Sequence, residues 1–242
     1  MYRLICSFLI IGASLVYAKN TAPSISFDIK DRNLARGEKL FSENCASCHV
    51  GRMDVNSTSF AVNPRNLELS LLSPEQMYHI INNGTAFYGS KTDYMIGYEN
   101  IYTSDEIKDI VAYIHTNLNV NYKEAKKLYQ ESEKLSKDKS KEDVLEEGRK
   151  VYLKRCIHCH GPSGKADGVA VKASNGNLFP YDLTKTLLTD EQMFLFTKYG
   201  SKHWGASRDD MPAWGSVYSD EAIHSVVEYI KVMVEKSSNT IK

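Results

Sequence analysis

The chain has 242 residues, of which 42% are hydrophobic and 25% are charged. This is the composition of a soluble globular protein, and the length allows one large domain or two small ones with separate cores. The 30 Lys and Arg residues balance the 30 Asp and Glu residues. A nucleic-acid partner usually requires a basic surface, so the balance of charge argues against one.

The N-terminus has the pattern of a secretion signal. Arg3 supplies a short positive region, an almost wholly apolar run follows, and Ala18 is the small residue expected at a cleavage site. A membrane anchor is the alternative, but the run is shorter than the ~20 residues that a spanning helix needs. We therefore expect residues 1–18 to be removed on export, and Cys6 with them. The remaining protein would be periplasmic, with no membrane span.

The four cysteines that follow form two Cys-x-x-Cys pairs, and each pair is followed directly by a histidine. The two motifs are Cys45, Cys48 and His49, and Cys156, Cys159 and His160. Cys-x-x-Cys-His is the attachment site of c-type haem: each thiol adds to one vinyl group, and the histidine binds the iron. The spacing suits this chemistry because one helical turn brings both sulfurs and the imidazole to one porphyrin. The sequence therefore predicts two covalently bound haem c groups.

Other uses of these cysteines match the pattern less well. An exported chain with four cysteines first suggests disulfides, and two Cys-x-x-Cys pairs could together hold one zinc ion. Neither explains the histidine that follows each pair. A thioredoxin-like redox site expects a strand before its motif, whereas a helical pattern precedes both motifs here.

The sequence around the motifs is repeated. Gly37 and Gly148 each precede the first cysteine of a motif by eight positions. The offset between the copies is 111 positions at the cysteines, and it becomes 116 positions at Leu71 and Leu187. The second copy thus has five additional residues after His160. Two copies are too few for a solenoid and indicate a tandem two-domain protein.

We expect the domains at residues 27–118 and 143–235. The segment 119–142 between them is rich in Lys, Glu and Ser, with apolar residues at loosely helical spacing, and is expected to form a charged helical linker. Within each copy, hydroxyl residues followed by proline or acidic residues predict helix starts. These are Ser73, Ser104, Thr189 and Ser219. Because no alternating strand pattern appears, the predicted fold is all-α.

Two pairs of methionines keep the 116-residue offset. Met95 and Met211 lie in loops shortly before the last predicted helix of each copy. Each half resembles a class I haem domain in this respect, and the resemblance implies that the second axial ligand to the iron lies on this loop. Met77 and Met193 lie within predicted helices and are typical of core residues. Pro212 follows Met211 and fixes the backbone of that loop. The predicted iron ligands are therefore His49 and Met95, and His160 and Met211.

Each half resembles a class I cytochrome c domain, and the whole chain resembles a tandem diheme cytochrome c. The resemblance implies that the first and last helices of each domain cross beside the haem. By match, the crossing residues are Gly37, Phe41 and Tyr113 in the first domain, and Gly148, Tyr152 and Tyr229 in the second. It also implies that the carbonyl of Pro64 or Pro180 accepts a hydrogen bond from the proximal histidine and so orients this ligand.

Five other histidines remain. We expect His115 and His224, in the last helices, to lie at the surface, and His158 to be an exposed interior residue of its motif. His79 and His203 are retained as minor candidates for iron ligation.

With two protein ligands on each iron, the resemblance favours a carrier that passes electrons between redox protein partners, such as a reductase and an oxidase. The alternative is a diheme enzyme, peroxidase-like or another small-molecule oxidoreductase, with the first haem as its active site. Met95 is followed by Ile96 where the second loop has proline, so the first loop is expected to have more freedom. An enzyme would use that freedom to open the iron to a small ligand.

Overall fold

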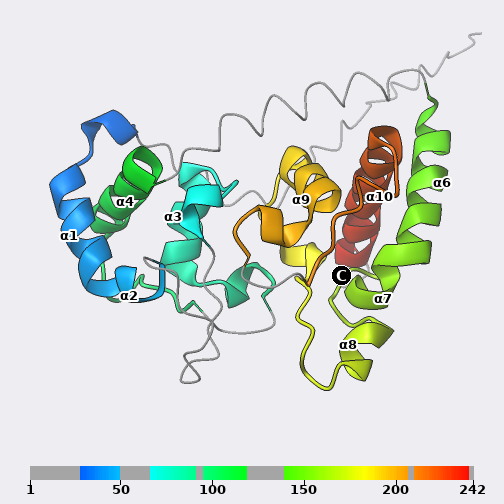
Figure 1. Ribbon diagram of the computed structural model, residues 1–242, viewed down its shortest axis with the longest axis horizontal. Coiled ribbons are helices and arrows are strands. Elements are labelled where there is room, and N and C mark those ends of the chain that lie inside the picture. The colour runs from blue at the N-terminus through cyan, green and yellow to red at the C-terminus, as the bar shows by residue number, and fades with distance from the viewer. Residues whose placement is uncertain (1–27, 50–65, 91–94, 119–138, 207–209, 240–242) are drawn as a thin grey trace, which may run out of the picture.

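The computed structural model describes residues 28–49, 66–90, 95–118, 139–206 and 210–239. All regular structure in these ranges is helical, which confirms the all-α fold. The helices form two similar groups, one from each half of the chain, placed side by side (Figure 1). The predicted signal at residues 1–18 and most of the predicted linker lie outside the described residues.

The N-terminal half is built from helices whose starts are fixed by side-chain caps. They are α1 (Leu34–Asn44), α2 (Ala46–His49), α3 (Pro74–Asn83) and α4 (Ser104–Tyr113), with short 3-10 turns at Ile29–Asp31, Leu67–Leu69 and Ala86–Tyr88 and a π turn at Ile114–Leu118. Ser73 caps α3 as predicted. The cap of α4 is Thr103, one residue before the expected Ser104, because its side chain and that of Glu106 bond to each other's backbone N–H groups.

The C-terminal half repeats this arrangement. Its helices are α6 (Lys141–Val151), α7 (Ile157–His160), α8 (Val169–Ala173), α9 (Asp190–His203) and α10 (Asp220–Asn239), with a π turn at Tyr152–Cys156 and a 3-10 turn at Leu183–Lys185. Thr189 caps α9 in a capping box, as Ser73 does α3. The five additional residues fall in the loop that contains α8, so they lengthen this loop and leave the shared helices in register.

The first and last helices of each half cross at the predicted glycines. At Gly37, a Cβ atom would lie 2.1 Å from the backbone oxygen of Asp109 on α4. At Gly148, it would lie 1.9 Å from the backbone oxygen of Ser225 on α10. No side chain fits at either position, so only glycine allows the two backbones to pack this closely. The predicted crossings are therefore confirmed.

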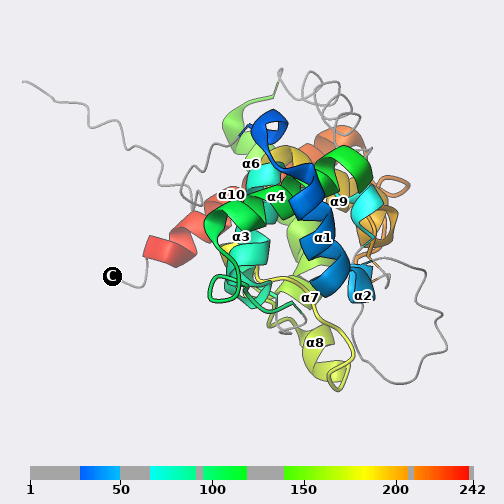
Figure 2. The same ribbon diagram turned by 90° about the vertical axis from the view of Figure 1, so that its left-hand side faces the viewer.

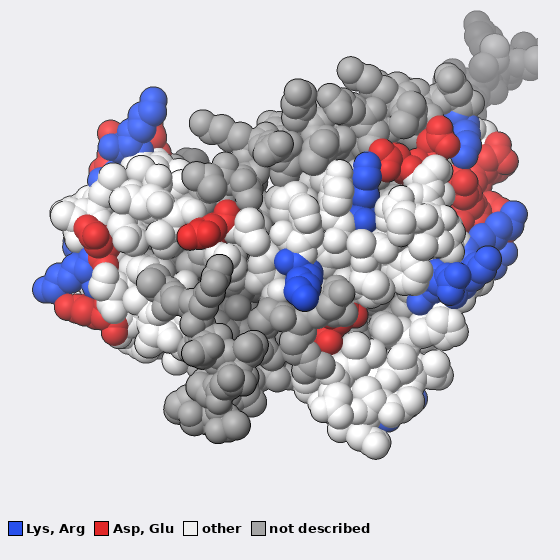
Figure 3. Space-filling model, viewed as in Figure 1, with Lys and Arg blue, Asp and Glu red and all other residues white. Residues whose placement is uncertain are grey.

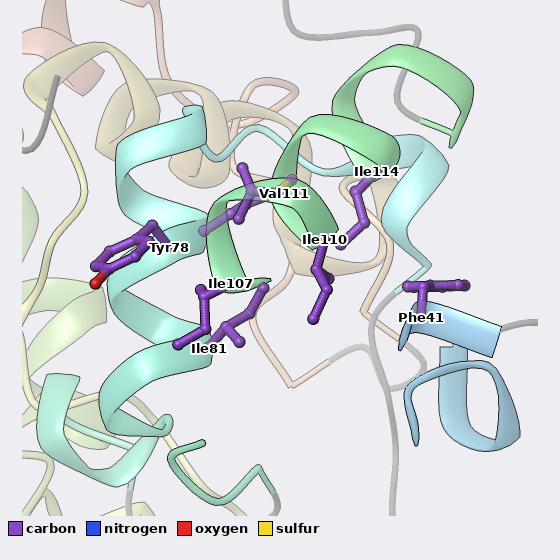
Figure 4. Packing of buried hydrophobic residues seen from close by; sticks show 8 residues of the cluster. Phe41, Tyr78, Ile81, Ile107, Ile110, Val111 and Ile114 are labelled. Carbon is purple, nitrogen blue, oxygen red and sulfur yellow. The ribbon is translucent and has the colours of Figure 1, made fainter. Parts of the chain in front are cut away.

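Each crossing continues in a pair of aromatic rings. Phe41 and Tyr113 lie with ring centroids 5.5 Å apart, and Tyr152 and Tyr229 at the same separation. Figure 4 shows the core of the N-terminal half, where side chains from α1, α3 and α4 meet. Its fully buried members include Phe41 and Ile110, each at most 1% exposed. This core closes one side of the space next to the attachment motif.

The two halves meet through α3 and α9, which lie between the outer helices of the two groups (Figures 1 and 2). Leu71 from the N-terminal half is 1% exposed and belongs to a cluster with Phe194 and Trp204 of the other half. Gln76 of α3 and Gln192 of α9 donate to each other's side-chain oxygens, with both distances 2.7 Å. Because these glutamines are 116 positions apart, corresponding residues face each other, as across a two-fold axis.

Two histidines differ from expectation. His224 on α10 is only 4% exposed and packs on the ring of Phe194, with centroids 4.9 Å apart, so its prediction as a surface residue is wrong. His115 is partly buried, and burial lowers its pKa. His158 is exposed as predicted. In the part of the chain that the structure describes, no helix is long and apolar enough to cross a membrane.

Candidate haem-binding sites

The N-terminal attachment motif lies at the mouth of an apolar cavity. The turn from α1 into α2 carries Cys45, Cys48 and His49. The cavity has about 430 Å³ of space, counting the part open to solvent. Its lining consists of Phe41, Cys45, His49, Leu67, Leu72, Met77, Ile80, Ile81, Met95 and Ile114. The structure thus brings one predicted haem cysteine and both predicted ligands of the first site around one space.

The four predicted attachment cysteines are free thiols. Burial raises the pKa of Cys45 to about 11 and that of Cys156 to about 12, and in each pair the second thiol raises it further. Burial also raises the pKa of Cys159. Cys45, Cys156 and Cys159 are therefore held neutral and partly buried, which suits a site where their sulfurs become thioethers to a large apolar ring.

The second motif has the same placement after a first helix. Tyr152 donates from its hydroxyl to the carbonyl of Gly161, at 2.6 Å, and so ties the end of the motif to the π turn that follows α6. His160 Nδ1 lies 3.1 Å from the carbonyl oxygen of Tyr181, to which only the N–H tautomer can donate. The carbonyl that orients this histidine is thus one residue beyond the expected Pro180. Pro64, the predicted counterpart in the first half, lies outside the described residues.

This hydrogen bond determines which ring nitrogen can serve a metal. With Nδ1 of His160 donating to a carbonyl, Nε2 is the nitrogen that can bind iron, as in other oriented histidine ligands. Burial lowers the pKa of His160, which keeps the imidazole neutral, as ligation requires. The second-half histidine is therefore already in the tautomer that a haem iron needs.

Each predicted methionine ligand lies on a loop anchored to the end of a helix. Thr85 donates its backbone N–H to the carbonyl of Met95 at 3.0 Å, and its hydroxyl lies 3.4 Å from the same oxygen. The approach requires Gly84, whose φ is +80° and where a Cβ would lie 2.8 Å from the Met95 oxygen. Two further backbone bonds, from Tyr98 and Glu99 back to α3, hold the rest of the loop.

The second loop repeats these contacts. Ser201 donates its N–H to the carbonyl of Met211 at 2.9 Å. Gly200, with φ at +78°, again leaves room for the Met211 oxygen. Backbone bonds from Trp214 and Gly215 to α9 correspond to those of the first loop. The first loop therefore has the same backbone anchors as the second, although it lacks a proline after Met95.

The residues fit a covalently bound haem better than they fit a shared metal ion. Among the described residues, which include both motifs, no three His, Cys, Asp or Glu side chains lie close enough to hold a metal ion. The two Cys-x-x-Cys pairs thus do not form one four-cysteine site in this fold. Each pair instead adjoins its own histidine, and the first faces a cavity lined almost wholly by apolar surface.

Comparison with known proteins agrees with this geometry. The family model of cytochrome c oxidase, cbb3-type, subunit III matches residues 32–114 and again residues 143–230. These matches together span more than half of the chain. The chain belongs to this family of c-type cytochromes. Such proteins bind haem c covalently and transfer electrons to and from redox partners.

The cytochrome is also similar to cytochrome c6 of Parathermosynechococcus lividus. The two are 32% identical over 87 residues, which cover 34% of this chain and 87% of the relative. Among solved structures, a chain of the reducing HAO-like protein complex of Kuenenia stuttgartiensis is 20% identical, with a TM-score of 0.44. That match covers 86% of this cytochrome and 99% of the other chain.

An aromatic pair next to each motif was missed by sequence reasoning. The rings of Tyr98 and Tyr102 are stacked, with centroids 5.7 Å apart, and pack with Cys45 in the N-terminal core. Burial raises the pKa of both hydroxyls, and nearby Cys45 raises it further. In the second half, Trp214 and Tyr218 occupy the matching positions, 116 residues later. That offset was the signal by which the pairs could have been found.

The two minor candidates for iron ligation lie away from the first cavity. His79 is 5% exposed and packs edge-on against Tyr78 and Tyr88. His203 is exposed and stacks on Tyr199. Met77, by contrast, lines the cavity together with Met95, so this predicted core residue also faces the cofactor space of the cytochrome.

Proposed function

We propose that the cytochrome carries two haem c groups, one in each half. The first would be attached through Cys45 and Cys48, and the second through Cys156 and Cys159. The iron ligands would be His49 with Met95, and His160 with Met211. The observation that carries the proposal is the repetition of one complete arrangement: a motif after the first helix, and a methionine loop whose carbonyl is bonded to the residue after Gly84 or Gly200.

The function that this arrangement supports best is periplasmic electron transfer. Residues 1–18 would be the export signal, and residues 27–118 and 143–235 the two haem domains, joined by the linker 119–142. Bound haem supplies a one-electron couple, so a donor loses one electron and an acceptor gains it, with no bond to the protein made or broken. Histidine with methionine on one iron raises the reduction potential.

The protein residues orient the ligands and exclude water. The carbonyl of Tyr181 holds the ring of His160, and the N–H groups of Thr85 and Ser201 hold the two methionine loops. The apolar lining of the first cavity would keep water from a bound haem iron and lower the local dielectric, which would tune the reduction potential. These are the tasks of an electron carrier, in which protein ligands would occupy both axial positions of each iron.

A carrier is favoured over an enzyme because the first methionine loop is anchored. An enzyme of the peroxidase-like kind would need Met95 to leave the iron easily. The bond from Thr85 N–H to the Met95 carbonyl, together with the close packing at Gly84, matches the anchoring of Met211 and opposes such release.

Redox partners would dock near the methionine loops. Ile96 and Ile101, on either side of the first loop's anchor, are 59% and 58% exposed. On the face shown in Figure 3, charged side chains gather mainly over the outer helices, and fewer lie between them. A terminal oxidase is a candidate acceptor, because the family takes its name from subunit III of cbb3-type cytochrome c oxidase.

The haem content of the exported protein tests the proposal. Intact mass spectrometry of periplasmic material should give the chain from about residue 19 plus two haems. Met95→Ala and Met211→Ala should each remove the near-infrared sulfur-to-iron band of one haem and lower its potential. Leu153→Ala, an exposed site, is the control that should leave both bands unchanged. A mass with one haem or none, or both bands intact in Met95→Ala, would contradict the proposal.

A further inference from the structure

A single peptide unit joins the second candidate haem site to the first half of the chain. His160 Nδ1 donates to the carbonyl of Tyr181 at 3.1 Å. That carbonyl and the N–H of Asp182 belong to the same peptide. The Asp182 N–H in turn donates to the carbonyl of Gly89, in the N-terminal half, at 2.8 Å. The predicted proximal ligand of one haem is therefore two hydrogen bonds from the backbone of the other half.

The chain of bonds continues to the first methionine loop. The carbonyl of Gly89 and the N–H of Ser90 share a peptide, and Ser90 donates to the carbonyl of Thr85 at 3.2 Å. Thr85 donates its own N–H to the carbonyl of Met95 at 3.0 Å. Backbone hydrogen bonds thus lead from His160 to Met95, the predicted distal ligand of the other site, with one covalent step through Thr85, whose carbonyl and N–H belong to successive peptides.

The mirror-image series is present from Asn66 to Met211, and its first bond, from His49 to the carbonyl of residue 65, would lie outside the described residues. Asn66 donates its N–H to the carbonyl of Gly205 at 2.8 Å. The next peptide N–H, that of Ala206, donates to the carbonyl of Ser201 at 3.1 Å, and Ser201 donates to the carbonyl of Met211 at 2.9 Å. Each of these residues lies 116 positions from its counterpart in the first series.

The contacts between the halves depend on two glycines with positive φ. Gly89 has φ of +94°, and a Cβ there would lie 2.5 Å from the oxygen of Asp182. Gly205 has φ of +85°, and a Cβ would lie 2.4 Å from the oxygen of Asn66. Asp182 is 7% exposed and Gly89 is buried, so water competes little for their bond. Hydrogen bonds in such surroundings are stronger and polarise one another.

We propose that these two series couple the haem sites reciprocally, so that a change of state at one iron shifts the reduction potential of the other. The proposal rests on the proposed function. A histidine ligand donates more strongly as its iron becomes more positive, which polarises the peptide between Tyr181 and Asp182 and tightens its bond to Gly89. That bond supports the segment from which Thr85 holds the Met95 loop. By linkage, a change in the Met95 loop acts on His160 with equal free energy.

Asp182→Pro removes the one N–H that connects the halves in the first series. The φ of Asp182 is −70°, which proline adopts without strain. The side chain of Asp182 also accepts a bond from Thr184 N, and this bond is lost as well. Asp182→Ala is therefore the matched control, since it loses the same side chain and keeps the N–H.

The coupling is measured by combining each variant with Met95→Ala. In the native and Asp182→Ala backgrounds, Met95→Ala should shift the reduction equilibrium of the second-half haem by about fivefold, or ~40 mV at 59 mV per tenfold for one electron. In the Asp182→Pro background this shift should fall to less than half. Direct electrostatic interaction between the irons is present in all backgrounds and cancels in the comparison.

The mirror pair separates hydrogen bonding from simple opening of the interface. Asn66→Pro, with Asn66→Ala as its control, should reduce the effect of Met211→Ala on the first-half haem and leave the effect of Met95→Ala on the second-half haem intact. A proline that merely wedged the halves apart would reduce both effects from either position, and this result would overturn the proposal. Asn66 is exposed, so this half of the test remains if Asp182→Pro does not fold.

Two results need no proline variant. If Met95→Ala leaves the potential of the second-half haem unchanged in the native background, the coupling is absent and the proposal is wrong. If mass spectrometry finds fewer than two haems, the proposed function fails first, and this outcome is distinct from a diheme protein whose sites titrate independently.

Discussion

The paired glutamines at the interface give a prediction with a magnitude that the structure supplies. Gln192 donates to the carbonyl of Leu71 at 2.6 Å and exchanges two bonds with Gln76 at 2.7 Å. Its oxygen also accepts the N–H of Thr189 at 2.8 Å. Gln192→Met keeps the size of the side chain and removes all of these bonds.

The cost of the single substitution follows from what it leaves unpaired. The Leu71 carbonyl and the Thr189 N–H each lose a partner, and the side-chain amide of Gln76 loses both of its hydrogen bonds to Gln192. A buried polar group without its partner costs roughly 1–3 kcal/mol. Taking the lower end for each of these groups, Gln192→Met should lower the free energy of unfolding by about 3 kcal/mol. Gln76→Met, which frees the matching groups, should cost about as much.

The double variant should cost less than the two single variants together. When both glutamines are methionine, no side-chain amide remains to be left unpaired, and only backbone groups lack partners. We expect a loss of about 4 kcal/mol, and so a coupling of about 2 kcal/mol between the two positions. Guanidinium unfolding of the oxidised protein, followed by circular dichroism, measures each value.

The control is Lys202→Met, an exposed position on α9 that should change stability by less than about 0.5 kcal/mol. Additive costs for Gln76→Met and Gln192→Met would show that the amides do not interact in solution. A cost below about 1 kcal/mol for either single variant would show that the interface is wet or open there.

Three further predictions concern the rest of the molecule. Gly148→Ala should lower the free energy of unfolding by at least about 2 kcal/mol, because its Cβ would meet the backbone of α10. The control Lys150→Ala, at an exposed position, should lower it by less than about 0.5 kcal/mol, and denaturant unfolding measures both values. Burial holds the pKa of His115 below 6.5, so stability that is present above that pH should be lost as the pH falls through the pKa of the folded protein. In thermal scans at a series of pH values, His115→Asn should lose less stability over this range than the native protein, and an equal loss in both would refute the prediction. The reduced protein should bind carbon monoxide at neither haem on mixing, and rapid binding to half of the haem would favour the enzyme alternative.

The sequence predicted the parts of the structure that depend on spacing within one half. The helix crossings at Gly37 and Gly148 are found as expected, because only glycine fits where two backbones nearly touch. The histidine orientation was missed by one residue, at Tyr181 instead of Pro180, since spacing locates a loop but not which of its carbonyls turns inward.

Contacts between packed helices could not be read from the sequence, either within one half or between the halves. His224 was expected at the surface because it occupies a polar position on its own helix, but the ring of Phe194 on α9 covers it. Gln76 and Gln192 could be read only as residues of helix caps. Periodicity shows which face of a helix is apolar, and it carries no information about which other helix that face meets.

The interface has the geometry of a symmetric dimer formed within one chain. Gln76 and Gln192 face each other, and the Asn66–Gly205 contact matches the Asp182–Gly89 contact. In a dimer of separate chains, the strength of such an interface would depend on protein concentration. Here the partner surface is covalently attached, so its effective concentration stays high however dilute the protein becomes. The distance between the two candidate cofactor sites is thereby independent of dilution.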